Sequence, residues 1–203
     1  MEIIIGVVVL VISAILHEIM HGVVADKLGD PTARVMGRLT LNPIPHIDPV
    51  MSILVPALLV MSGSPVIFGA AKPVPVNPIH FKDPKKDMAL VSLAGPLTNL
   101  FIAIVASQII RFIPLGYPLT TLFYTIVLYN LMLGFINLIP IPPLDGSKVL
   151  AAFLPNELAL SYLSIDRIGI FILFALLLFP IGGFSLGDII SNLIIFSVHI
   201  LGI

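Results

Sequence analysis

Long runs of apolar residues, separated by short polar or proline-rich connections, dominate the chain. Six of these runs approach the length of about 20 residues that a helix needs to cross the hydrocarbon core of a bilayer. They cover roughly residues 3–25, 50–70, 88–112, 119–141, 167–182 and 186–203. The pattern predicts an all-α integral membrane protein with about six transmembrane helices, hence a multi-pass protein of a cell membrane.

The connections between these runs are short. The longest cover roughly residues 26–49, 71–87 and 142–166, and none is long enough to build an independent hydrophobic core. We therefore expect residues 1–203 to form a single membrane domain, with no additional soluble module.

Two of the connections carry prolines at alternating or nearly alternating positions, NPIPHIDP (42–49) and KPVPVNP (72–78). Proline fixes φ and removes a hydrogen-bond donor, so these stretches are expected to be extended rather than helical. The neighbouring residues 34–41 and 74–81 are candidates for short strands at the membrane edge. Ordinary surface loops are the alternative.

Composition strengthens the membrane interpretation. The chain is 58% hydrophobic and 10% charged, whereas about 25% of the residues of a soluble domain are charged. The formal net charge of −1 gives no reason to expect nucleic acid binding. Cysteine is absent, which excludes disulfides and a thiol nucleophile.

The first apolar run contains the sequence HEIMH. His17 and His21 are one helical turn apart and project from the same face, so both imidazoles can reach one metal ion. Glu18 lies beside them, near enough to take a proton from a metal-activated water. Ionisable side chains at the bilayer centre cost roughly 2.5–3.5 kcal/mol each on insertion scales, so their presence demands a reason. The alternative is a motif at the helix end, where polar side chains reach the interface.

A catalytic zinc ion usually has three protein ligands and an open position. Most other acidic and histidine residues lie in polar connections, where they need no special explanation. Asp145 is different, because it follows a long apolar run in NLIPIPPLDG (137–146), where prolines break the helix. A simple helix stop with Asp145 as the next N-cap is the alternative.

Two asparagines also lie in apolar surroundings. For Asn99 we expect a packing role between helices. Asn137 precedes the broken segment that carries Asp145, so it has the better chance of facing the site, where it would orient a ligand or hold an oxyanion.

HEIMH followed far downstream by NLIPIPPLDG resembles the site-2 protease family, the intramembrane zinc metalloproteases of peptidase family M50. NPIPHIDP, GAAKPVPVNP (69–78) and AGPLTN (94–99) also resemble segments of its compact archaeal and bacterial type. The resemblance covers roughly residues 10–150.

The resemblance implies a role for each matching residue. His17, His21 and Asp145 would be the ligands of a Zn²⁺ cofactor, and Glu18 the general base toward the zinc-activated water. Asn137 would be a further catalytic-site residue. His46 and Asp48 would be structural or close to the substrate, not ligands.

The resemblance further implies an endopeptidase whose partners are a transmembrane protein substrate and the lipid bilayer. The PDZ or CBS module of many relatives does not fit in this chain. The sequence leaves the oligomeric state open.

Two other functions compete with this one. A divalent-metal transporter also uses HE-rich transmembrane motifs, but it would employ Glu18 as a ligand rather than as a base. A prenyl-protein endopeptidase also has HExxH, but its third ligand would be a glutamate on a later helix, which LDG fits poorly.

Overall fold

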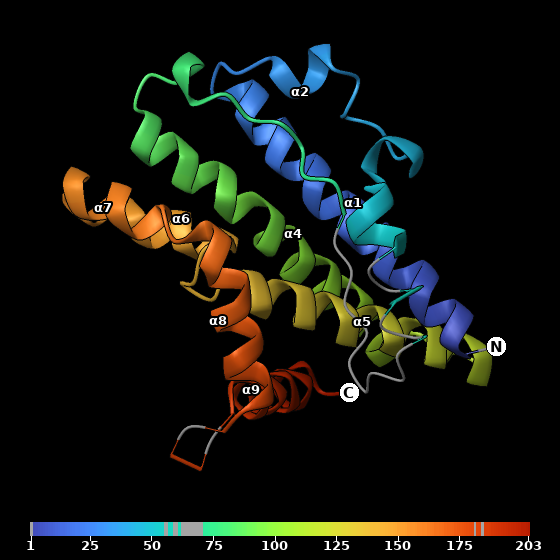
Figure 1. Cartoon of the computed structure of the whole chain (residues 1–203). Coiled ribbons are helices and arrows are strands. Elements are labelled where there is room, and N and C mark those ends of the chain that lie inside the picture. Colours follow the sequence, from blue (N-terminus) through green and yellow to red (C-terminus); the bar gives the residue numbers. More distant parts are fainter. Residues whose placement is uncertain (1, 55–56, 59–60, 62–70, 181, 184) are drawn as a thin grey trace.

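Among the residues that the computed structural model describes, which are 2–54, 57–58, 61, 71–180, 182–183 and 185–203, the regular structure is helical (Figure 1). Three helices are long and apolar enough to cross a membrane: α1 (Glu2–Lys27), α4 (Pro84–Phe112) and α5 (Tyr117–Asn137). α4 packs against both α1 and α5, and α1 also contacts α5. These three helices form the body that carries the candidate site.

The other helices are shorter. They are α2 (Thr32–Val35), η1 (Ile44–His46), η2 (Pro49–Leu54), η3 (Pro78–His80), α6 (Asp145–Ala151), α7 (Asn156–Leu163), α8 (Asp166–Leu178) and α9 (Leu186–Leu201). α6 packs against α4, and α9 packs against α5 and α8. Figure 1 shows α6, α7 and α8 on the side of α4 opposite α1.

Helix boundaries follow local chemistry. Asp83 is the N-cap of α4 and accepts a hydrogen bond from the backbone of Lys86, while Pro84 occupies the first position of the helix. Ser185 and Asp188 form a reciprocal capping box at the start of α9. α5 ends at Asn137, shortly before Pro140, which together with Pro142 and Pro143 prevents its continuation.

The predicted all-helical membrane fold is confirmed in its coarse form, but six spans are not. The predicted runs 3–25, 88–112 and 119–141 correspond to α1, α4 and α5. α8 and α9 occur where the last two runs were expected, but they have 13 and 16 residues, fewer than the roughly 20 that a span requires. Most of the predicted run 50–70 lies outside the described residues.

The predicted short strands are wrong for both segments. Residues 34–41 form the end of α2 and turns, and residues 74–81 run without regular structure into η3. Prolines at 73, 75 and 78 remove the backbone donors that a strand ladder would need.

Polar and apolar side chains are distributed as a membrane protein requires. Large apolar side chains face outward, among them Phe101 at 65% and Phe171 at 70% exposed. In contrast, Asn99, Asn130 and Ser107 are fully buried. Exposed hydrocarbon on this scale suits lipid contact, while polar groups at membrane depth must find partners inside the protein.

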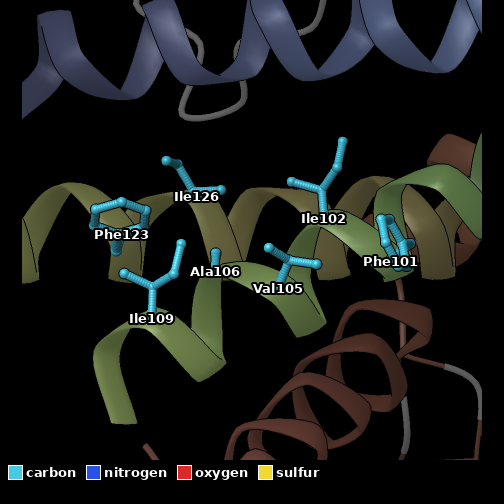
Figure 2. Close-up of a pocket in the computed structure, with 7 residues that line it drawn as sticks. All are labelled: Phe101, Ile102, Val105, Ala106, Ile109, Phe123 and Ile126. Carbon is cyan, nitrogen blue, oxygen red and sulfur yellow. The ribbon is translucent and has the colours of Figure 1, made fainter. Parts of the chain in front are cut away.

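A hollow of about 240 Å³ lies between α4 and α5 (Figure 2). Its lining is entirely apolar: Phe101, Ile102, Val105, Ala106, Ile109, Phe123 and Ile126. It offers no titratable or metal-binding group, so the chemistry must lie elsewhere.

Asp30, which follows α1, ties together the connections at that end of the helix. It is 0% exposed. One carboxylate oxygen accepts hydrogen bonds from Thr32 and from His80 Nδ1 at 2.8 Å, and the other accepts from the Asn77 N–H at 2.6 Å. Burial alone raises the pKa of Asp30, but the hydrogen bonds from Thr32, Asn77 and His80 outweigh it and hold that pKa below its usual value.

We predict that Asp30→Asn lowers the stability of the protein at neutral pH by about 1–3 kcal/mol, because charge-assisted hydrogen bonds are lost from a buried group. The folded-state pKa is depressed, so this stabilisation is present above the unfolded-state value of about 3.9 and is lost as the pH falls through the folded-state pKa. Thermal unfolding in detergent should therefore show a deficit at pH 7 that narrows below about pH 4. Glu157→Gln, which changes an exposed acid, serves as the control with little expected effect; an equal deficit for Asp30→Asn at both pH values would contradict the charge-based explanation.

Candidate metal centre

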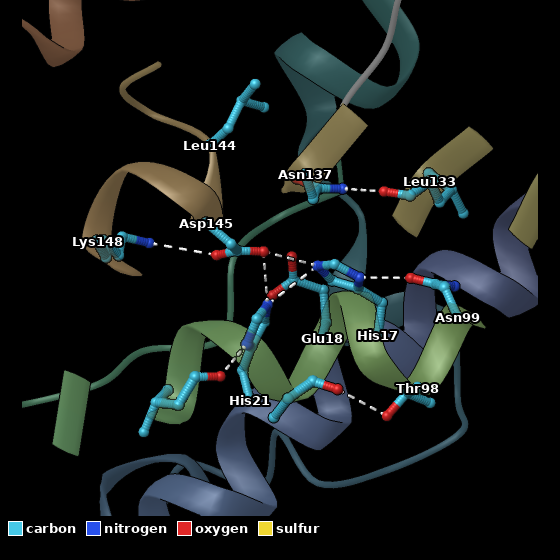
Figure 3. A network of polar contacts seen from close by, with 12 residues as sticks. His17, Glu18, His21, Thr98, Asn99, Leu133, Asn137, Leu144, Asp145 and Lys148 are labelled. Atoms are coloured by element: carbon cyan, nitrogen blue, oxygen red, sulfur yellow. Dashed lines mark hydrogen bonds and ion pairs between the residues drawn. The ribbon is translucent and has the colours of Figure 1, made fainter. Parts of the chain in front are cut away.

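Two histidines on α1 and one aspartate on α6 meet in a buried cluster between α1, α4 and α6 (Figure 3). His17 Nε2 and His21 Nε2 each lie 3.1 Å from Asp145 Oδ2, and the two nitrogens are 3.0 Å apart. The imidazole rings are nearly perpendicular, with centroids 4.6 Å apart. The exposed fractions of the three residues are 6%, 8% and 7%. The cluster thus unites residues that are up to 128 positions apart in the sequence.

The hydrogen bonds of the two histidines determine where their lone pairs point. His17 Nδ1 lies 2.6 Å from Asn99 Oδ1, and His21 Nδ1 lies 2.7 Å from the carbonyl oxygen of Val91. Both partners accept hydrogen bonds, so each Nδ1 carries the proton and, in a neutral imidazole, each Nε2 is a bare acceptor. Two lone pairs and a carboxylate oxygen therefore converge on one buried point.

This convergence fits a metal ion. Zinc bonds to histidine and carboxylate of about 2.0–2.2 Å place neighbouring ligands of a tetrahedron about 3.3 Å apart, close to the separations in the cluster. Two imidazoles and one carboxylate form a donor set suited to zinc, and three protein ligands leave one position for water.

Gly95 makes room for the cluster on α4. A methyl group at this position would lie 2.5 Å from His21 Nε2 and 2.6 Å from His17 Nε2. Glycine is therefore required for α4 to pass this close beneath the two imidazoles.

Gly146 has a comparable role beside Asp145. A methyl group there would overlap the backbone carbonyls of Leu138 and Ile139, at the end of α5. The N-cap of α6 is Leu144, with no side-chain cap, so the alternative of Asp145 as a capping residue is wrong. Instead, Asp145 directs Oδ2 to the histidines, while Oδ1 lies 3.6 Å from Lys148 Nζ.

Glu18 lies next to the cluster in Figure 3. Its Oε2 accepts a hydrogen bond of 2.8 Å from the backbone N–H of Val74. Pro73 and Pro75 have no N–H, so Val74 supplies the one backbone donor of this tripeptide. Buried Arg38 donates to the carbonyls of Lys72 and Pro73, which holds the extended segment over α1.

The structure does not bring the remaining predicted residues into the cluster. Asn137 donates to the carbonyl of Leu133, 3.0 Å away, on its own helix. His46 is buried and lies 2.9 Å from the carbonyl of Thr40, and Asp48 accepts from the N–H of Val50. That His46 and Asp48 are not ligands stays a prediction.

Asn99 is the residue whose importance the sequence reasoning missed. Packing between helices was expected, but Asn99 also contacts a histidine of the cluster directly. The signal lay in AGPLTN, where Gly95 and Asn99 are one turn apart and thus share a helix face.

Comparison with known proteins indicates a protease family. The family model described as "Peptidase family M50" matches residues 114–180, a stretch that contains Asp145 but not the two histidines. No solved structure matches the chain.

Several relatives have zinc-protease names. "Putative zinc metalloprotease YwhC" of Bacillus subtilis is 34% identical over 91% of this chain and 85% of its own length. "Putative zinc metalloprotease Rip2" of Mycolicibacterium smegmatis is 31% identical over 87% of this chain and 69% of its own. "Zinc metalloprotease MJ0392" of Methanocaldococcus jannaschii is 30% identical over 74% of this chain and 34% of its own. Together with the family match and the converging side chains, these similarities show that the chain belongs to peptidase family M50, a family of zinc metalloproteases.

Proposed function

We propose that the protein is a multi-pass intramembrane zinc endopeptidase of the cell membrane, with residues 1–203 forming one domain, which cleaves transmembrane segments of other membrane proteins. His17, His21 and Asp145 hold the zinc ion, and Glu18 is the general base. The observation that carries the proposal is the convergence of two Nε2 atoms and one carboxylate oxygen at 3.0–3.1 Å in a buried place.

A zinc ion held by His17, His21 and Asp145 would lower the pKa of a water bound to it and would polarise the carbonyl of the peptide bond. Glu18 receives the proton of the attacking water on its carboxylate and delivers it to the leaving amine. The N–H of Val74 supports this role, since it holds the carboxylate beside the cluster without neutralising it.

The membrane location explains the choice of substrate. The site residues His17 and His21 lie on a helix that is long and apolar enough to span a bilayer, and apolar side chains cover the outside of the bundle. A site in this position suits a peptide bond within a transmembrane segment of another protein. Asn137 remains a predicted catalytic-site residue; its bond to Leu133 offers no support for that role.

A divalent-metal transporter is the weaker alternative. It would use Glu18 as a ligand, yet the ligand atoms that converge within 4.8 Å among the described residues come from His17, His21 and Asp145. Glu18 instead accepts from a backbone amide.

The first test measures bound zinc per chain in the detergent-purified wild type and in His17→Ala, Asp145→Ala and Glu18→Gln. We expect about one zinc in the wild type and in Glu18→Gln, and loss in the other two variants, because a catalytic site has three protein ligands. Glu18→Gln should also lose cleavage of a transmembrane peptide by at least 10²-fold. Zinc retained in Asp145→Ala and lost in Glu18→Gln would favour the transporter.

A second prediction concerns the space beneath the imidazoles. Gly95→Ala should strongly reduce zinc binding without unfolding the protein, because the new methyl group lies within 2.6 Å of both histidines. Gly116→Ala is the matched control, since a methyl group there meets nothing within 4 Å and its φ of −70° suits alanine. Equal zinc content and helicity in the two variants would disprove the close approach of α4 to the site.

A further inference from the structure

A continuous chain of buried polar side chains leads from His17 into the core between α1, α4 and α5. Asn99 Oδ1 lies 2.6 Å from His17 Nδ1, Asn99 Nδ2 donates to Asn130 Oδ1 at 2.8 Å, and Asn130 Nδ2 donates to Ser13 Oγ at 2.9 Å. Both asparagines are 0% exposed and Ser13 is 4% exposed. Each of the three long helices contributes at least one member.

Backbone carbonyls fix the direction of this chain. Asn130 Nδ2 also lies 2.8 Å from the carbonyl of Ile126, and Asn99 Nδ2 lies 3.4 Å from the carbonyl of Ser13. A carbonyl can only accept a hydrogen bond. Turning either amide around would therefore bring two oxygens together in a buried place, which is costly. The two amides can adopt one orientation only.

The orientation of the two amides also determines which atom of Asn99 faces His17. Because Asn130 must present its oxygen to Asn99, Asn99 presents its amide to Asn130 and its own oxygen to His17. An oxygen at this position accepts the proton of Nδ1, so Nε2 faces Asp145 with a lone pair. His21 obtains the same tautomer directly, from the backbone carbonyl of Val91.

We propose that Asn99, supported by Asn130 and Ser13, is a positioning residue that fixes His17 in the tautomer able to bind the metal. The proposal rests on the metal site assigned above. Partners of the non-coordinating nitrogen hold metal-binding histidines in place in other proteins, and their loss typically weakens metal binding 10–100-fold. Here the partner of His17 is the side-chain amide of Asn99. The orientation of that amide is set by Asn130, whose own orientation is set by the backbone carbonyl of Ile126.

Two substitutions at one position separate positioning from packing. Asn99→Leu keeps the branching at Cγ, in a somewhat larger side chain, but removes the acceptor for His17, and we expect zinc to bind 10–100-fold more weakly. Asn99→Asp keeps an oxygen toward Nδ1 but places its second oxygen against Asn130 Oδ1; we expect a less stable protein whose zinc affinity nevertheless stays well above that of Asn99→Leu. A pure packing role predicts that both variants are impaired, because both lose the bond to Asn130.

Asn130→Leu tests the relay, by which we mean the orientation of Asn99 by Asn130. We expect an intermediate loss of zinc affinity, because Asn99 then keeps only the longer contact with the Ser13 carbonyl. Ser107→Ala is the control for removal of a buried polar group. Ser107 lies on α4, is 0% exposed, and donates to the carbonyl of Ile104, outside the hydrogen-bonded series that leads to His17. This variant should bind zinc like the wild type.

The tautomer is measured directly in the metal-free protein. With histidines labelled in ¹⁵N, long-range proton–nitrogen correlation identifies the protonated ring nitrogen in each of the five histidines; the His17 signal is the one missing in His17→Asn. We expect protonated Nδ1 in the wild type, and a mixture in Asn130→Leu.

Protonation at Nε2 of the wild type, or wild-type zinc affinity in Asn99→Leu, would overturn the proposal. If Asn99→Leu fails to fold, the wild-type spectrum and Asn130→Leu decide in the same way. A wild type that binds no zinc but has the Nδ1 proton on His17 would refute the metalloprotease function and leave the relay intact.

Discussion

Three hydrogen-bond acceptors, the Nε2 atoms of His17 and His21 and Oδ2 of Asp145, lie within 3.1 Å of one another in a buried place. In the neutral imidazoles neither Nε2 brings a proton to this point, because the one proton of each ring is on Nδ1, which donates elsewhere. Such a cluster is repulsive until a cation joins it. Much of the surrounding structure holds these atoms together: Gly95 and Gly146 permit the close approach of α4 and α6, and the Asn99–Asn130 chain fixes one of the rings.

Burial of this cluster in an apolar bundle explains the rest of the polar core. Hydrocarbon supplies no hydrogen bonds, so every polar group at membrane depth needs a partner from the protein. Ser13, Asn99 and Asn130 satisfy one another and the helix backbone. The polar residues that the site requires thus also determine how α1, α4 and α5 pack.

The sequence was most informative where the helical repeat or the length of an apolar run alone determined the structure. The spacing of His17 and His21 placed both on one helix face, and apolar run length identified α1, α4 and α5. Asp145 was found because prolines isolate it after an apolar run. Asn99 was assigned only to packing, since its contact with His17 spans 82 positions and depends on how α4 crosses α1. The strands at 34–41 and 74–81 were mispredicted because a sequence that favours an extended backbone does not ensure a neighbouring strand with which to form hydrogen bonds.

The proline-rich segment shows how an unpaired extended stretch can still be ordered. Alternate prolines leave Val74 with the one N–H between positions 73 and 75, and this N–H donates to Glu18. Arg38 anchors the adjacent carbonyls of Lys72 and Pro73 from the other side. In a β-strand the backbone N–H groups would donate to a neighbouring strand; here the Val74 N–H donates to the Glu18 carboxylate beside the candidate metal cluster. The proposed reaction needs a charged base in apolar surroundings, and the Val74 N–H gives the Glu18 carboxylate a backbone dipole that stabilises its charge without adding a titratable group.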